Sequence, residues 1–311
     1  MSEVIKKIVI VGAGLMGASI AQSFPEYGIE TVIYSKSTND FDRARKIIAN
    51  GQKTLVENKV LRQEESDRIQ SAIVYTVDKE CFGDADWIIE AIPENLELKQ
   101  SLFGTISGYA KKNAIITSNT SAISIDALSE FVENPERFCG THWLNPAHII
   151  PLVEITKGIK TSQETADAIY QILTFIKKQP VMLKKDVKGF LSNRLQFALL
   201  REATYLVEQG VADPEDIDKT IKYGNGLRYT CSGPFKIADL GGLTVFNAVA
   251  KYLYADLADE KKDNHLLEKL VEEGNNGIST GKGFYQYQEL DLENEEKERD
   301  TMILGILRNR N

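Results

Sequence analysis

The chain has 311 residues, of which 42% are hydrophobic and 26% charged, so its composition is that of an ordinary globular protein and neither disordered nor fibrous. Its formal net charge of −8 argues against general binding of nucleic acid. This length predicts one or two domains of about 100–200 residues each. The cysteines Cys81, Cys139 and Cys231 are widely spaced without a CxxC pair, which indicates neither a disulfide framework nor a zinc site.

The N-terminal residues reach an apolar run at Ile8 without the long hydrophobic stretch and cleavage site of a signal peptide. Other apolar runs, such as residues 88–92, have the length of strands and fall well short of the roughly 18 residues that suggest a membrane span. We therefore expect a cytoplasmic protein without a membrane partner.

Short apolar runs alternate with helical patterns through more than half of the chain. Strands are predicted at residues 7–12, 31–34, 72–76, 87–92, 114–118, 137–143, 152–156 and 180–184, with helical stretches at 15–27, 42–58, 96–111 and 164–178. This alternation indicates an α/β domain with a mainly parallel sheet covered on both faces. From Phe190 onward the pattern is helical. We predict an α/β domain at 1–185 and a smaller all-α domain at 186–311.

The first predicted strand ends in a glycine-rich turn. Gly12, Gly14 and Gly17, with Leu15 and Met16 between them, have the G-x-G-x-x-G spacing and stand between a strand and a helix. The first glycine allows a sharp turn, the second lets the backbone approach a pyrophosphate, and the third lets helix and strand pack closely. The alternative is that the glycines only tighten the turn. The context favours dinucleotide binding.

The residues after the second strand leave the choice of dinucleotide open. NAD-binding domains often carry an Asp or Glu there that accepts from the 2′-hydroxyl of the ribose. Here the strand is followed by Ser35 and Lys36, and a hydroxyl beside an ammonium group would not repel a 2′-phosphate. Lys36 could equally be a solvated loop residue. NAD is the expected cofactor, with NADP as the alternative.

A histidine and a glutamate near two neighbouring strands could supply acid-base chemistry. His142 ends an apolar strand, and Glu154 lies between apolar residues on the next one. A carboxylate that holds one imidazole nitrogen would stabilise the charged ring after proton uptake near neutral pH. The alternative is a buried histidine bound to backbone groups and a glutamate at a strand edge, and the sequence alone does not separate these two interpretations.

A set of short motifs follows in chain order: Gly12-Ala-Gly-Leu-Met-Gly17, Glu90-Ala-Ile-Pro-Glu94-Asn-Leu-x-x-Lys99, Ser118-Asn-Thr-Ser121, His142-Trp-Leu-Asn145-Pro146, Leu152-Val-Glu154, Gly189-Phe-Leu-Ser-Asn193-Arg194 and Thr280-Gly-Lys-Gly-Phe-Tyr285. This set resembles the 3-hydroxyacyl-CoA dehydrogenase family, with some similarity to the branch that contains L-gulonate 3-dehydrogenase. The resemblance implies a Rossmann-type domain, a helical domain through which a homodimer forms, and an active site between the two domains. It also implies an oxidoreductase with a small-molecule substrate, as in fatty-acid metabolism.

The resemblance assigns roles to individual residues. His142 would be the acid/base and Glu154 its partner, while Ser118 and Asn193 would hydrogen-bond the substrate oxygen. Without the resemblance, Ser118 and Asn193 would be interpreted as a cap and a helix-start amide. The positions that would line the nicotinamide and ribose of the cofactor are Glu94, Lys99 and Asn145.

Departures from the family's pattern leave the substrate open. Relatives that use coenzyme A carry a serine and a lysine on the helix after the second strand, and here Gly51 and Asn58 lie near those places. We predict oxidation of the 3-hydroxy group of a short 3-hydroxyacyl-CoA, with a free small hydroxy acid as the alternative substrate. A non-catalytic nucleotide-binding or structural protein is the alternative from another class.

Overall fold

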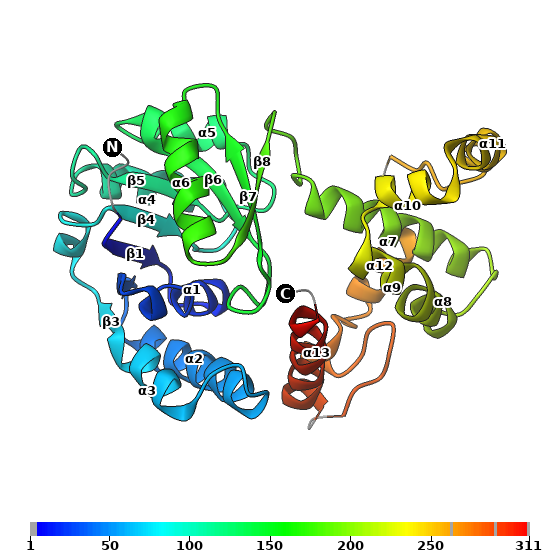
Figure 1. Cartoon of the computed structure of the whole chain (residues 1–311), viewed down its shortest axis with the longest axis horizontal. Helices are drawn as coiled ribbons and strands as arrows, with labels where there is room; N and C mark the ends of the chain where they lie inside the picture. The colour runs from blue at the N-terminus through cyan, green and yellow to red at the C-terminus, as the bar shows by residue number, and fades with distance from the viewer. Residues whose placement is uncertain (1–4, 262–263, 289–290, 310–311) are drawn as a thin grey trace. The chain divides into compact units, whose positions relative to one another are not determined.

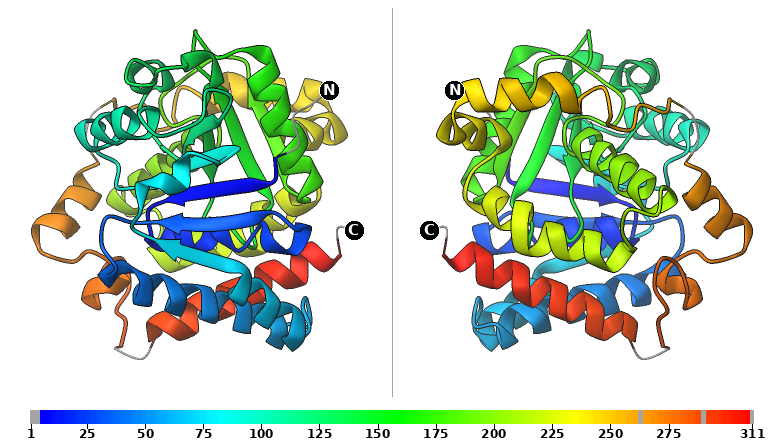
Figure 2. Two further views of the ribbon diagram at one scale, coloured as in Figure 1. Left: turned by 90° about the vertical axis from the view of Figure 1, so that its left-hand side faces the viewer. Right: turned by 90° about the vertical axis from the view of Figure 1, so that its right-hand side faces the viewer.

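The computed structural model describes residues 5–261, 264–288 and 291–309, and the chain divides into two units, Met1–Arg194 and Leu195–Asn311. An eight-stranded sheet forms the first unit, in the order β3-β2-β1-β4-β5-β6-β7-β8. Its strands are β1 (Lys7–Val11), β2 (Glu30–Tyr34), β3 (Ile73–Thr76), β4 (Trp87–Glu90), β5 (Ile115–Ser118), β6 (Phe138–Trp143), β7 (Leu152–Lys157) and β8 (Gln179–Leu183). Figure 2 shows β1, β2 and β3 side by side in blue to cyan.

The neighbouring strands are parallel except for β6 and β7, which are antiparallel. The predicted, mainly parallel sheet is thus confirmed. The antiparallel pair has a simple cause, because the connection at residues 144–151 is shorter than the crossover of about a dozen residues that parallel neighbours require. The reversal brings the beginning of β7 beside the end of β6.

Alternate residues of β1 belong to different cores. Ile8 and Ile10 pack on one face of the sheet, and Val9 and Val11 on the other. Helices α1, α2 and α6 contribute to the first core and α4 and α5 to the second, as expected for a sheet covered on both sides. Each fully buried aliphatic side chain of this size contributes about 1.5–3 kcal/mol of transfer free energy.

The helices of the first unit follow the predicted pattern, with two additions. They are α1 (Leu15–Ala21), α2 (Asn39–Glu57), α3 (Gln63–Ala72), α4 (Leu96–Ser107), α5 (Ile125–Ser129) and α6 (Gln163–Phe175), with short 3₁₀ turns at Pro25–Tyr27, Lys79–Phe82 and Pro135–Arg137. Helices α3 and α5 were not predicted from the sequence, and the predicted start of α2 was residue 42. Because α2 begins at Asn39, Asp40 lies in its first turn.

The second unit is helical, as predicted (Figure 1). Its helices are α7 (Ser192–Glu208, in which the division between the units falls), α8 (Pro214–Thr220), a π-helical turn (Ile221–Asn225), α9 (Gly226–Cys231), α10 (Pro234–Gly241), α11 (Leu243–Leu253), α12 (His265–Glu272), a 3₁₀ turn (Ile278–Thr280) and α13 (Asp291–Arg308). Among the described residues, every helix is too short or too polar to cross a lipid bilayer.

Candidate active site

The glycine turn after β1 has the geometry that a pyrophosphate needs. Gly12 has a φ of +119°, and a Cβ there would lie 2.6 Å from the carbonyl oxygen of Ala91. A Cβ on Gly17 would lie 1.8 Å from the carbonyl oxygen of Gly12, whereas Gly14 has no atom within 4 Å of its Cβ position. Gly14 is also the N-cap of α1 and makes no side-chain cap hydrogen bond. The open backbone at the positive end of α1 therefore fits an anionic group.

The predicted cofactor-binding residues beside the glycines and after β2 include both exposed and buried side chains. Leu15 is exposed, and Met16 packs partly against the first core. Ser35 is buried, and its hydroxyl donates to Oδ2 of Asp40 at 2.5 Å, whereas Lys36 is exposed. A carboxylate therefore lies beside the end of β2, and it comes from Asp40 in the first turn of α2.

His142 and Glu154 form a hydrogen-bonded pair on β6 and β7. They are directly opposite each other in the antiparallel register, so both side chains lie on the same face of the sheet. Nδ1 of His142 lies 2.8 Å from Oε2 of Glu154, and the two side chains are only 5% and 1% exposed. An ionised carboxylate can only accept, so Nδ1 carries the ring proton and Nε2 keeps its lone pair in the neutral ring.

The second oxygen of Glu154 anchors the start of α7. Oε1 accepts the backbone N–H groups of Leu191 and Ser192, both at 2.9 Å. Burial alone would raise the pKa of Glu154, but the hydrogen bond with His142 and these two backbone donors outweigh it and hold the pKa below its ordinary value. Glu154 is therefore ionised near neutral pH and stabilises a protonated imidazole.

The other ring nitrogen of His142 faces a serine that was not among the predicted catalytic residues. Oγ of Ser121 lies 3.2 Å from Nε2 of His142. Nδ2 of Asn193 donates to the carbonyl oxygen of Ser121 at 3.3 Å, and the ring of Phe190 lies 5.4 Å from the imidazole, centre to centre. His142, Glu154 and Asn193, three of the four predicted catalytic residues, are therefore close together, with Ser121 beside them.

Ser118, the fourth, is oriented toward a different group. Its hydroxyl donates to Oε2 of Glu90, the last residue of β4, and both side chains are fully buried. Nζ of Lys99 lies 2.6 Å from the other oxygen of Glu90. Burial raises the pKa of Glu90, and the ammonium of Lys99 and the hydroxyl of Ser118 oppose that rise. The structure thus shows Ser118 as part of a closed ionic cluster.

Glu94 shapes the loop after β5. Its Oε2 lies 3.2 Å from Nζ of Lys99. Its Oε1 accepts from the hydroxyl of Thr120 at 2.5 Å and from the backbone N–H groups of Ser121 and Ala122 at 2.9 Å. Burial acts to raise the pKa of Glu94, but Thr120, Lys99 and the two N–H groups keep it below the ordinary value. Glu94 and Lys99 therefore position Ser121 through this loop.

The connection after β6 holds the remaining predicted residue. Asn145 is exposed there. His148 in the same connection is half-buried, with its Nδ1 2.9 Å from Oγ of Ser19 on α1. A Cβ on Gly51 would lie 2.8 Å from Nε2 of His148 and 2.9 Å from Oε1 of Gln22, so a larger residue at this position would displace one of these side chains. Asn58, at the C-cap of α2, is half-buried and donates from its side chain to the carbonyl of Thr54.

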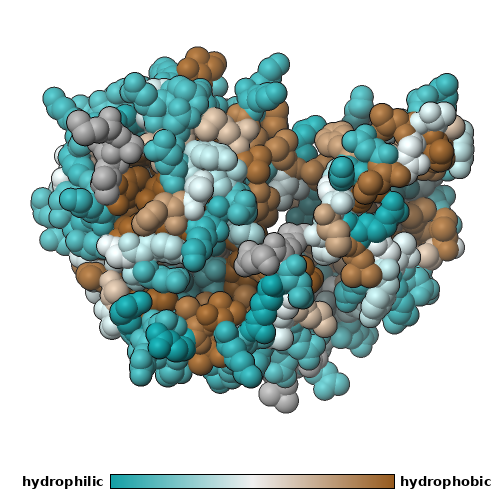
Figure 3. Space-filling model, viewed as in Figure 1, coloured by the Kyte–Doolittle hydropathy of each residue, from teal (hydrophilic) through white to brown (hydrophobic). Residues whose placement is uncertain are grey.

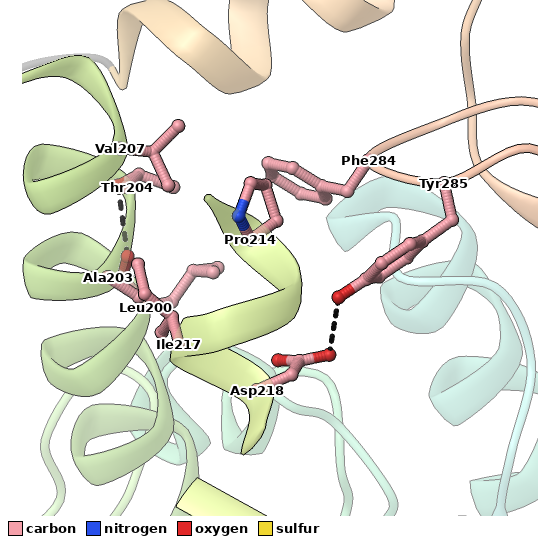
Figure 4. Close-up of a pocket in the computed structure, with 9 residues that line it drawn as sticks. All are labelled: Leu200, Ala203, Thr204, Val207, Pro214, Ile217, Asp218, Phe284 and Tyr285. Atoms are coloured by element: carbon pink, nitrogen blue, oxygen red, sulfur yellow. Dashed lines mark hydrogen bonds between the residues drawn. The ribbon is translucent and has the colours of Figure 1, made fainter. Parts of the chain in front are cut away.

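The second unit contains a hollow of about 140 Å³. Figure 4 shows its lining, which is Leu200, Ala203, Thr204, Val207, Pro214, Ile217, Asp218, Phe284 and Tyr285. The hydroxyl of Tyr285 donates to Asp218 at 2.8 Å, and burial together with that carboxylate raises the pKa of Tyr285 to about 12. Phe284 and Tyr285 come from the motif that starts at Thr280, so this motif packs the helical unit.

A mainly parallel sheet with a glycine turn at the end of β1 is the architecture of a dinucleotide-binding oxidoreductase. The family model described as "3-hydroxyacyl-CoA dehydrogenase, NAD binding domain" matches residues 7–187, and "3-hydroxyacyl-CoA dehydrogenase, C-terminal domain" matches residues 189–287. The chain therefore belongs to the 3-hydroxyacyl-CoA dehydrogenase family, and it is an NAD-dependent oxidoreductase of this type.

Similar proteins in the family act on different substrates. The chain is 34% identical over 309 residues to 5-formyl-3-hydroxy-2-methylpyridine 4-carboxylate 5-dehydrogenase of Mesorhizobium japonicum, with 98% of each chain covered. A crystal structure of an enzyme of that name, described as an NAD⁺-dependent dismutase, has a TM-score of 0.92 at 33% identity and 98% coverage of both chains. A probable 3-hydroxybutyryl-CoA dehydrogenase of Deinococcus radiodurans is 35% identical over 282 residues, covering 90% of this chain and 100% of the relative.

Proposed function

We propose that this protein oxidises a hydroxyl group on a small carboxylic acid, with His142 as the acid/base. One observation carries the proposal. A buried carboxylate, Glu154, holds Nδ1 of His142, while Nε2 faces the hydroxyl of Ser121. A ring oriented in this way can take a proton on one nitrogen and be stabilised through the other.

The residues divide the reaction between them. Bound NAD would supply the hydride acceptor for the carbon that carries the hydroxyl group. Nε2 of His142 takes the hydroxyl proton, and Glu154 stabilises the imidazolium that results. Ser121 and the amide of Asn193 supply donors to the substrate oxygen. Ser121 thus takes the role that the sequence analysis assigned to Ser118, whose hydroxyl is bound to Glu90.

A free acid is favoured over a coenzyme A thioester by two observations. The Mesorhizobium relative, which is named for a pyridine carboxylate, aligns with 98% of this chain. In addition, Gly51, near one of the places on α2 where coenzyme A users carry a polar residue, has no side chain to offer and packs against His148. We infer that the substrate is a small hydroxy acid, or a formyl acid that reacts as its hydrate.

The second candidate substrate is a short 3-hydroxyacyl-CoA. It is supported by the Deinococcus relative, which is 35% identical and aligns over its full length. In this case the proton and hydride steps would be the same, but the thioester's nucleotide end would contact residues other than Gly51 and Asn58.

Turnover with NAD separates these candidates. The panel contains 3-hydroxybutyryl-CoA, free 3-hydroxybutyrate, and hydroxymethyl and formyl pyridine carboxylates, and NADH formation is measured by absorbance. We expect kcat/KM for a free acid to exceed that for the thioester by at least tenfold. Higher kcat/KM for the thioester would overturn the substrate assignment, and failure of His142→Gln to reduce either activity would overturn the mechanism.

We further propose that the protein forms a homodimer through its helical unit. Apolar side chains lie exposed on α10 and α11, and Figure 3 shows apolar surface over these helices. Phe235, Leu240, Leu243, Val245 and Tyr252 are among them. Exposed apolar surface of this kind is typical of an association site. Sedimentation analysis of the native protein and of Phe235→Asp, in which a charge replaces a residue that is 87% exposed, tests this proposal. A monomeric native protein would contradict it.

A further inference from the structure

The structure assigns the recognition of the NAD ribose to Asp40, which Ser35 holds at the end of β2. We propose that this pair replaces the strand-end acid of NAD-binding domains and makes the protein prefer NAD to NADP. The proposal uses only the NAD-binding character of the domain, so it does not depend on the identity of the substrate.

Ser35 stands where the ribose-binding acid is expected. It directly follows β2, and the N–H of Gly12 donates to the carbonyl of Tyr34 at 2.9 Å, which places the end of β2 beside the glycine turn. The N–H of Ser35 donates to the carbonyl of Thr76 at 3.1 Å and fixes the chain at this point. In dinucleotide-binding domains, an acid at this edge of the sheet accepts from the 2′-hydroxyl of the ribose.

Asp40 can perform that role from the following helix. Its Oδ2 accepts from the buried hydroxyl of Ser35 at 2.5 Å, so the serine fixes the position of the carboxylate. The residue is exposed in the first turn of α2, where the helix dipole favours a negative charge. A carboxylate offers about four acceptor positions, and Ser35 occupies one of them. The others are available to a ribose hydroxyl.

The same negative charge opposes NADP. A 2′-phosphate at this position would meet the carboxylate of Asp40 instead of a hydroxyl acceptor, and two anions at hydrogen-bond distance repel each other. Lys36 and Arg43 are exposed cations near Asp40 in the sequence and would have the opposite effect. Arg45 is turned to another partner, since its guanidinium lies 4.0 Å from the ring centre of Tyr75. The preference therefore depends on whether Asp40 outweighs Lys36 and Arg43.

Direct binding measurements test this balance without any substrate. Dissociation constants for NADH and NADPH are measured by fluorescence titration for the native protein, Asp40→Asn and the control Asp42→Asn. Asp42 is also exposed in the first turn of α2. We expect the native protein to bind NADH more tightly than NADPH. Asp40→Asn should weaken NADH binding about ten- to hundredfold, as expected for loss of a charged acceptor, and strengthen NADPH binding, whereas Asp42→Asn should change neither.

Two further variants keep the test decisive if Asp40→Asn does not fold, as judged by circular dichroism. Ser35→Ala leaves Asp40 in place but unanchored, so the ratio of the two dissociation constants should fall between those of the native protein and Asp40→Asn. The exchange S35D/D40S returns the acid to the strand end and should restore tight NADH binding. Native protein that binds NADPH as tightly as NADH, or Asp40→Asn that behaves like Asp42→Asn, would overturn the proposal.

Discussion

Two buried glutamates near the same edge of the sheet differ in what surrounds them. Glu90 at the end of β4 is bound to the amino group of Lys99 and to the hydroxyl of Ser118. Glu154 on β7 is bound instead to His142, an imidazole that can carry a proton on one or on both ring nitrogens. Glu90 therefore belongs to a closed cluster, while Glu154 supports a ring whose other nitrogen faces the hydroxyl of Ser121. Burial of a carboxylate does not by itself identify a catalytic group. A hydrogen-bond partner that can exchange a proton is the more informative feature.

The largest expected effect concerns the pair of His142 and Glu154. His142→Gln removes the proton acceptor, and we expect turnover to fall by about 10²–10⁴, the usual range for acid-base catalysis. NADH binding should stay close to that of the native protein, which a fluorescence titration checks. Unchanged turnover would remove His142 from the mechanism and would mean that Glu154, like Glu90, has only a structural role.

A change in the cluster of Glu90, Lys99 and Ser118 should lower the stability of the protein. Lys99→Met leaves Glu90 buried without its cation, which should cost about 3–5 kcal/mol of the free energy of unfolding, measured by denaturant titration. The matched control is Lys219→Met, because Lys219 forms an exposed ion pair with Glu215 at 3.0 Å on α8. Such surface pairs contribute about 0–1 kcal/mol. Equal losses in the two variants would mean that the Glu90 cluster has no special structural role.

Two serines allow the same comparison, because Ser118 is bound to Glu90 while Ser121 lies beside His142, the partner of Glu154. Ser121→Ala should lower kcat by about ten- to hundredfold with little change in stability, because it removes a donor beside Nε2 of His142. Ser118→Ala should instead lower the free energy of unfolding by about 1 kcal/mol through its lost hydrogen bond to Glu90. Steady-state kinetics and thermal unfolding of both variants distinguish a catalytic role from a structural one. A larger kcat loss in Ser118→Ala would reverse the roles proposed here.

The smallest effect is a pH dependence. Because the folded state holds the pKa of Glu154 below its ordinary value of 4.5, the ionised group stabilises the fold above that value, and this contribution is lost as pH falls through the lower, folded pKa. The stability difference between the native protein and Glu154→Gln should therefore be largest near neutral pH and shrink toward pH 3. Denaturant titrations over that range measure it. A difference that is constant with pH would show that the native contacts do not favour the ionised form.

The sequence predicted the fold well because its strands are continuous apolar runs with few competing patterns. The run at 87–92, for example, contains the fully buried residues of β4. The His142 and Glu154 pair could be proposed because two short strands separated by a brief connection must lie side by side. Which of the two serines in Ser118-Asn-Thr-Ser121 faces the imidazole could not be predicted, since that depends on how Glu94 folds the loop after β5.

Asp40 shows a second limit of sequence patterns. The helix that carries it was predicted to begin at residue 42, which left residue 40 in a loop, and α2 in fact begins at Asn39. Contact between Ser35 and Asp40 follows from the sharp return of the chain from β2 into α2, a three-dimensional detail that hydrophobic periodicity does not encode. The boundary predicted at residue 185 rests on a change of pattern alone and stays a prediction.

Glu154 uses its two oxygens for different elements, one for His142 and one for the backbone where α7 begins. The imidazole and the amide of Asn193 are therefore set by a single side chain and cannot diverge independently. An aspartate in this place is one methylene shorter and would have to release one of the two elements. Natural variation and laboratory selection for new substrates should accordingly spare this position while they alter the residues around it.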